Sequence, residues 1–116
     1  IQSNSVMPIS SALAGKEWSP ESTRATSAAG IAVAAPPRLD RILSILNSTG
    51  GKVANVSENQ ILYWQHLLAE KEGLFVEPTS AAAFAGLEIL NEQGMFKPNE
   101  TVLLPITGFG LKEPLH

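Results

Sequence analysis

The segment "VLLPITGFGLKEP", residues 102–114, places one hydroxyl and two glycines directly after an apolar run. The run predicts a strand from Val102 to Ile106, followed by Thr107, Gly108, Phe109 and Gly110. Ligands of α/β sheets bind at the carboxyl ends of strands. Glycines there permit backbone angles with φ > 0 and close approach of a ligand. We therefore regard Thr107 as a candidate ligand contact, with a simple glycine turn after a core strand as the alternative.

A second candidate is Glu77 in "EGLFVEP". It follows an apolar segment and precedes Pro78 and a run of small residues that predicts a helix. A carboxylate near a helix N-terminus is favoured by the positive end of the helix dipole. Glu77 is therefore interpreted either as a carboxylate that caps the helix or stabilises its dipole, or as part of a site.

Most other kinds of site are excluded or unsupported by the sequence. There is no cysteine, which excludes disulfides, thiolate metal sites and cysteine nucleophiles. The patterns GxSxG, HExxH and GxxxxGK[ST] are absent, and "GFGLKE" has only the first two glycines of GxGxxG. No set of metal ligands stands out, and we predict no metal.

Composition limits the class of protein. The chain has 116 residues, 44% of them hydrophobic, which is typical of one globular domain without an internal boundary. Its 8 basic and 11 acidic residues give a formal net charge of -3, and the basic residues are scattered, so nucleic acid is an unsupported partner. No apolar run is long enough for a membrane span, and residues 1–5 lack the features of a signal peptide. We expect a soluble, cytoplasmic protein.

The predicted elements alternate between strands and helices. Apolar spacing, prolines near helix starts and glycines at helix ends place them along the chain. Strands are expected at residues 1–6, 53–56 and 102–106, and helices at residues 8–13, 39–46, 58–72 and from 78 onward. Ser57 and Gln60 form a capping-box pattern at the start of the third helix, and Gly73 is expected to end it. The alternation predicts an α/β fold, a parallel sheet with helices on both faces.

Two motifs in the right order carry a family resemblance. "EGLFVEPTSAAAFAGL" followed by "VLLPITGFGLKEP" resembles the C-terminal part of the pyridoxal-phosphate enzymes of the tryptophan-synthase-β superfamily (fold type II), most closely threonine synthase. "IQSNSVMPISSA", "ATSAAGIAVAAPPR" and "STGGKVANVSENQIL" resemble other segments of that family. The resemblance covers nearly the whole chain.

The resemblance implies that residues 1–116 are the C-terminal part of a single large domain that binds pyridoxal 5'-phosphate. The lysine that forms the Schiff base and the phosphate-binding segments lie upstream in such proteins, so this chain alone is expected to be inactive. The chain's own lysines fall in other family segments, and none is assigned the Schiff-base role: Lys16, Lys52, Lys71, Lys97 and Lys112. The implied parent enzyme is a homodimer that acts on a small amino-acid substrate, converting O-phosphohomoserine to threonine by elimination and water addition.

Three cofactor-binding residues follow from the resemblance. Thr107 matches the serine or threonine whose hydroxyl meets the pyridine nitrogen of the cofactor, and Gly108 lies beside it in the turn. Glu77 matches a glutamate that approaches the same edge of the ring. A carboxylate would favour a protonated ring nitrogen, and a neutral hydroxyl does not. The ring is therefore expected to be a weaker electron sink.

Two positions depart from the threonine synthase pattern. Phe109 stands where histidine is common, and Asn4 stands where many members have glutamate. The segment "GIAV" is equally similar to the threonine and serine dehydratases, so a related dehydratase or lyase stays an alternative. A further alternative is a non-catalytic binding module that retains this part of the fold. Relatives that bind a divalent metal after the first strand use acidic residues there, and residues 4–8 supply none.

Overall fold

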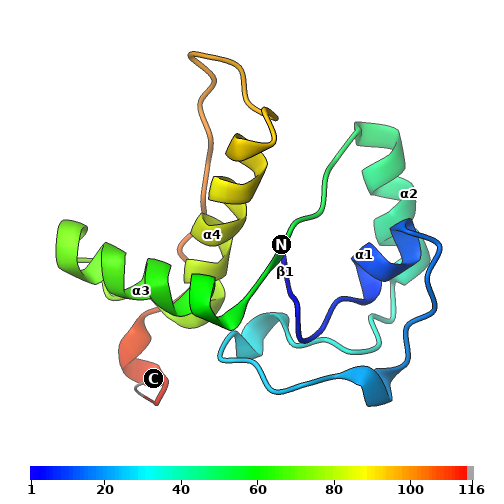
Figure 1. Cartoon of the computed structure of the whole chain (residues 1–116), viewed down its shortest axis with the longest axis horizontal. Helices are drawn as coiled ribbons and strands as arrows, with labels where there is room; N and C mark the ends of the chain where they lie inside the picture. Colours follow the sequence, from blue (N-terminus) through cyan, green and yellow to red (C-terminus); the bar gives the residue numbers. More distant parts are fainter. Residues whose placement is uncertain (115–116) are drawn as a thin grey trace.

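The computed structural model describes residues 1–114 and has the α/β organisation predicted from the sequence (Figure 1). Helices α3 and α4 lie on one side of the two short strands, and α1 and α2 lie on the other. In chain order the elements are β1 (Gln2–Ser3), α1 (Pro8–Leu13), η1 (Pro20–Ser22), η2 (Ala29–Ile31), α2 (Leu39–Thr49), β2 (Asn55–Val56), α3 (Glu58–Glu72), α4 (Pro78–Glu92) and η3 (Gly110–Lys112), where η marks a 3-10 helix. No helix among these residues is long and apolar enough to cross a membrane.

The predicted parallel pairing is present. Strands β1 and β2 are parallel, with Gln2 opposite Asn55 and Ser3 opposite Val56. The backbone N–H of Gln2 donates to the carbonyl of Ala54 at 2.9 Å, and that of Asn4 donates to the carbonyl of Val56 at 2.8 Å. Parallel strands need a crossover connection, and residues between Val6 and Ala54, including α1 and α2, supply it.

Local signals set the ends of the longer helices. Ser57 Oγ accepts from the backbone N–H of Gln60, and the Gln60 side chain accepts from the backbone N–H of Ser57, so the predicted capping box is confirmed. Gly50 and Gly73 end α2 and α3 in the left-handed conformation, at φ of 66° and 67°. Glycine adopts that conformation without the steric cost that a Cβ brings.

The core lies where α3 packs on α4 and β2. Ile61 and Leu68 of α3 meet a row of small residues on α4, of which Ala81, Ala82 and Ala85 are buried. Gly86 continues the row, and a Cβ at that position would lie 2.2 Å from Cδ1 of Ile1. The small side chains of α4 therefore serve close packing, as expected for a helix pressed between two layers.

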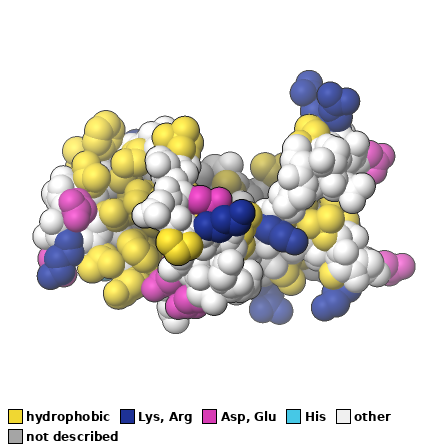
Figure 2. Space-filling view, turned by 90° about the horizontal axis from the view of Figure 1, so that it is seen from above, with side chains coloured by type: hydrophobic (Ala, Val, Ile, Leu, Met, Phe, Trp, Pro, Cys, Tyr) yellow, Lys and Arg dark blue, Asp and Glu magenta, His cyan; other side chains and the backbone are white. Residues whose placement is uncertain are grey.

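The prediction of a buried strand from Val102 to Ile106 is wrong for the described structure. These residues form no regular element, and Leu103 is 86% exposed. A strand needs a neighbouring backbone for its hydrogen bonds, and no segment of residues 1–114 lies beside this run as a paired strand. Figure 2 shows hydrophobic side chains gathered over the half of the molecule that carries α3 and α4, the half to which this run belongs.

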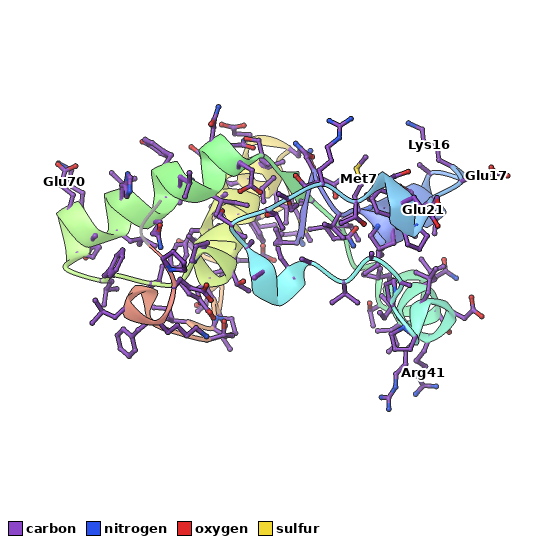
Figure 3. All side chains as sticks on the ribbon, turned by 90° about the horizontal axis from the view of Figure 1, so that it is seen from below. Met7, Lys16, Glu17, Glu21, Arg41 and Glu70 are labelled. Carbon is purple, nitrogen blue, oxygen red and sulfur yellow. The ribbon has the colours of Figure 1, made fainter. Side chains whose placement is uncertain are left out.

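The carboxylate of Glu58, at the start of α3, holds the loop of residues 16–30. It accepts hydrogen bonds from the backbone N–H of Ser27 at 2.8 Å, from Ser27 Oγ at 2.7 Å, from Ser3 Oγ at 3.2 Å and from Thr26 Oγ1. Desolvation by burial opposes ionisation of Glu58, but these hydrogen bonds outweigh it and hold the pKa of the carboxyl below its usual value. Figure 3 shows that Lys16 and Glu17, at the start of the loop, lie at the edge of the molecule, whereas Ser27, which Glu58 holds, is near the end of the loop.

We predict that Glu58→Gln lowers the free energy of unfolding by about 1–3 kcal/mol, because an amide presents N–H groups to several donors. Urea denaturation measures the loss, with Glu17→Gln as an exposed control from the same loop. Since the pKa of Glu58 is lowered in the folded protein, its contribution is complete above the ordinary carboxyl pKa of about 4.3 and disappears as the pH falls through the folded value. Equal unfolding midpoints for both variants at neutral pH would contradict the assignment.

Candidate functional site

The turn of residues 107–110 is held against the start of α4 by backbone contacts. The N–H of Glu77 donates to the carbonyl of Gly108 at 3.0 Å, and the N–H of Gly110 donates to the carbonyl of Phe75 at 2.9 Å. Val76 and Phe109 form an isolated antiparallel bridge between the same two segments. Two segments that are far apart in the sequence are thereby placed side by side, although no strand leads into the turn.

Glu77 is the N-cap residue of α4, and Pro78 follows it at the first helical position. Its side chain makes no capping hydrogen bond to the helix and is directed to the turn instead. Its position remains favourable for a negative charge because the helix dipole is positive at that end. Of the two interpretations of Glu77 from the sequence, a side-chain cap is wrong, and a place within a polar cluster is what the structure describes.

Four side chains form this cluster, which we call the Glu77 cluster: Glu77, Ser80, Thr107 and Lys112. Thr107 Oγ1 donates to Glu77 Oε1 at 2.9 Å and lies 3.0 Å from Ser80 Oγ. The backbone N–H of Thr107 donates to Ser80 Oγ at 3.0 Å. Glu77 and Ser80 are buried, whereas Thr107 is exposed, so the cluster reaches the surface at the threonine.

An ion pair closes the other side of the carboxylate. Lys112 Nζ lies 2.7 Å from Glu77 Oε2, with 56% of the lysine side chain and 8% of the glutamate side chain exposed. The hydrogen bond from Lys112 is the largest influence on Glu77, and with the bond from Thr107 it outweighs desolvation and lowers the pKa of the carboxyl. The same hydrogen bond raises the pKa of Lys112. Glu77 is therefore an ionised acceptor at neutral pH.

Gly108 leaves room for this pair. A Cβ on Gly108 would lie 2.6 Å from Glu77 Oε1 and 2.8 Å from Lys112 Nζ, which is closer than such atoms approach. Gly110 is similarly enclosed, because its Cβ would lie 2.7 Å from the ring of Phe75. Neither glycine has a positive φ, so the expectation of left-handed angles was wrong, and the need for close approach is the reason for glycine at both positions.

The sequence led to Glu77, Thr107 and Gly108, and the structure brings these three together. Sequence reasoning missed Ser80 and Lys112 as members of the cluster. Ser80 lies three residues after Glu77, almost one helical turn, and that spacing was the available signal. Lys112 gave no such signal, because its pairing with Glu77 depends on how the turn is folded.

The loop of residues 16–30 reaches the same helix end. The backbone N–H of Gly30 donates to Thr79 Oγ1 at 3.0 Å, and a Cβ on Gly30 would lie 2.8 Å from that oxygen. Thr79 lies between Pro78 and Ser80, so the loop supports the first turn of α4 from outside the cluster. Within residues 1–114 no group of three or more histidine, aspartate and glutamate side chains is placed to hold a metal ion.

The exposed edge of the Glu77 cluster presents one side chain that can form a hydrogen bond with a ligand. Thr107 offers a hydroxyl at the surface that can accept or donate a hydrogen bond. The absence of a side chain on Gly108 leaves room for Glu77 and Lys112 next to that hydroxyl.

Comparison with known proteins agrees with this chemistry. A family model described as "Pyridoxal-phosphate dependent enzyme" matches residues 1–108. The threonine synthase of Methanocaldococcus jannaschii is 37% identical, over 98% of this chain and 29% of its own length. The threonine synthases of Methanosarcina acetivorans and Halalkalibacterium halodurans are 39% and 37% identical, over 82% and 77% of this chain. The chain spans 24% to 29% of the length of these three relatives.

We predict that Gly108→Ala costs about 1–3 kcal/mol of the free energy of unfolding, because the new methyl group overpacks the ion pair. In a Glu77→Ala background the cost should fall, since the nearest atoms to that methyl group are then missing. Gly94→Ala is the matched control, because Gly94 has a φ of 72° and a Cβ added there would meet no atom within 4 Å, so its cost is backbone strain alone.

Urea denaturation of the single and double variants in a double-mutant cycle measures the coupling. The cost of Gly94→Ala should be the same with and without Glu77. A cost of Gly108→Ala that does not depend on Glu77 would contradict the steric explanation.

Proposed function

Because the chain belongs to the pyridoxal-phosphate-dependent enzymes, we propose that Thr107, Gly108 and Glu77 form one edge of the cofactor site in a threonine-synthase-like enzyme. Residues 1–116 would be the C-terminal part of its cofactor-binding domain. Thr107 carries the proposal, because it is an exposed hydroxyl that is anchored to a buried carboxylate. The hydrogen bond to Glu77 fixes the position of this hydroxyl, and the exposed side of Thr107 is open to a ring nitrogen.

Each residue has a defined task in this proposal. Thr107 would meet the pyridine nitrogen of the cofactor, which supplies an electron sink for bonds at the substrate's α-carbon. Glu77 would orient Thr107 through the hydrogen bond at 2.9 Å. Gly108 would bring its backbone beside Thr107 at the ring edge, while its missing side chain leaves room for Glu77 and Lys112. None of these side chains transfers a proton to substrate in the proposal, so their effect is on cofactor binding and orientation.

The proposed reaction of the intact enzyme is the conversion of O-phosphohomoserine to threonine by elimination and water addition. The relatives named threonine synthase support threonine as the product, and they match 77% to 98% of this chain. The lysine that carries the cofactor would lie in an upstream part of the parent enzyme, and this chain alone would be inactive. We further propose a cytoplasmic homodimer.

A related dehydratase or lyase is the second candidate. Phe109, next to Gly108 in the turn, is 70% exposed and stands where threonine synthases commonly have histidine. An apolar ring there would offer a substrate no hydrogen bond, in contrast to an imidazole. Assays with O-phosphohomoserine, threonine and serine as substrates of the intact enzyme separate the two candidates by which amino acid is consumed.

We predict that Thr107→Ala in the intact enzyme weakens cofactor binding about tenfold, the equivalent of one hydrogen bond of about 1.4 kcal/mol. Thr107→Ser should keep most of the affinity, because it retains the hydroxyl. Titration of the cofactor-free enzyme with pyridoxal phosphate, followed by visible absorption, measures both constants. An unaltered affinity and an unaltered rate of threonine formation in Thr107→Ala would remove Thr107 from the site.

A further inference from the structure

Ser80 contacts Thr107 twice, at the backbone and at the side chain. Its Oγ accepts a hydrogen bond from the backbone N–H of Thr107 at 3.0 Å and lies 3.0 Å from Thr107 Oγ1. Ser80 is 2% exposed, whereas Thr107 is exposed. A buried side chain of α4 therefore holds an exposed residue that lies 27 positions later in the sequence.

We propose that Ser80 is a positioning residue for the cofactor: its two contacts with Thr107 set where the threonine hydroxyl lies relative to the ring nitrogen. The inference rests on the proposed function, because it assumes that Thr107 meets that nitrogen. It adds to the site a residue that acts only through Thr107 and touches neither cofactor nor substrate.

The segment before Thr107 gives this residue no support. Residues 102–106 form no regular element, and no paired strand lies beside them within residues 1–114. The backbone contacts of the turn begin at Gly108, whose carbonyl accepts from the N–H of Glu77, and continue at Gly110. Ser80 extends the attachment of the turn by one residue, to the residue that carries the hydroxyl.

Ser80 is suited to this task because its own position is fixed. It lies in the first turn of α4, and Pro78 and Ala81 beside it are also buried. The backbone N–H of Gly30 donates to Thr79 Oγ1, so the loop holds the same turn from outside. A close-packed side chain has few alternative rotamers, and a hydroxyl that it anchors is fixed with it.

The hydroxyl protons of the pair allow the same contact before and after a ligand binds. A threonine hydroxyl has one proton and can also accept a hydrogen bond. In the structure the proton of Thr107 is directed to Glu77, and at a ring nitrogen it would be directed to the ring. In both cases Ser80 supplies the proton between Ser80 Oγ and Thr107 Oγ1. Ser80 can therefore hold Thr107 with or without the cofactor.

The first measurement needs no cofactor. In the intact protein before cofactor is added, hydrogen exchange measures the protection of the Thr107 amide. We expect Ser80→Ala to speed its exchange about tenfold or more, since the N–H loses its acceptor. Ser11→Ala is the matched control and should leave this exchange rate unchanged. Ser11 is also a buried helical serine, but its Oγ donates to the carbonyl of Met7 at the start of α1.

The second measurement is a double-mutant cycle in the intact enzyme, with cofactor affinity as the readout. Titration with pyridoxal phosphate should show that Ser80→Ala weakens binding about fivefold to tenfold, because Thr107 is no longer held in place. In a Thr107→Ala background the same substitution should cost less than about twofold, since the hydroxyl that Ser80 positions is already absent. Alanine is a good helix former and three alanines follow Ser80, so the variant keeps α4.

The outcomes separate the two proposals. An unchanged exchange rate of the Thr107 amide in Ser80→Ala would overturn the role of Ser80. An equal loss of cofactor affinity from Ser80→Ala with and without the Thr107 hydroxyl would also overturn it, as would no loss at all, while the proposed cofactor site stays intact. If Thr107→Ala itself binds pyridoxal phosphate as tightly as the wild-type enzyme, the proposed function of Thr107 and this inference fail together.

Discussion

The buried carboxylate of Glu77 is the constraint on which the arrangement of this site depends. An ionised group removed from water must be compensated by charge and hydrogen bonds, and here Lys112, Thr107 and Ser80 supply them. Thr107 comes from the turn that follows the long exposed run, Lys112 comes from η3 directly after that turn, and Ser80 comes from α4. Satisfying one carboxylate therefore joins two segments that lie far apart in the sequence. It also leaves the hydroxyl of Thr107 at the surface with a fixed anchor.

Close packing around that carboxylate depends on residues without large side chains. Gly108 lies where any Cβ would meet Glu77 and Lys112, and the alanines of α4 let the helix approach α3 and β2. Gly30 makes the corresponding close contact with Thr79 from the loop. That loop is in turn held by Glu58, a second carboxylate whose oxygens accept from neighbouring hydroxyls and a backbone N–H. The start of α4 is thus supported from the turn and from the loop.

The sequence predicted what local chemistry determines. Ser57 with Gln60 and Gly73 mark the two ends of α3 through interactions within a few residues, and those predictions are confirmed. The strand prediction for Val102–Ile106 was wrong, because burial of an apolar run depends on a paired neighbour that residues 1–114 do not supply. Gly108 and Thr107 were found from their place after that run, but the reason for the glycine was steric and not conformational. The pairing of Lys112 with Glu77 could not be predicted from the sequence, because the two residues come together only when the turn is folded.

The central claim is that the Glu77 cluster holds the ring edge of pyridoxal phosphate through Thr107. The most direct measurement is a crystal structure of the intact enzyme with the cofactor bound. We expect the pyridine nitrogen within hydrogen-bonding distance of Thr107 Oγ1, at about 2.7–3.2 Å, with the hydrogen bond between Thr107 and Glu77 retained. A ring nitrogen that meets another residue, with Thr107 facing solvent, would contradict the account.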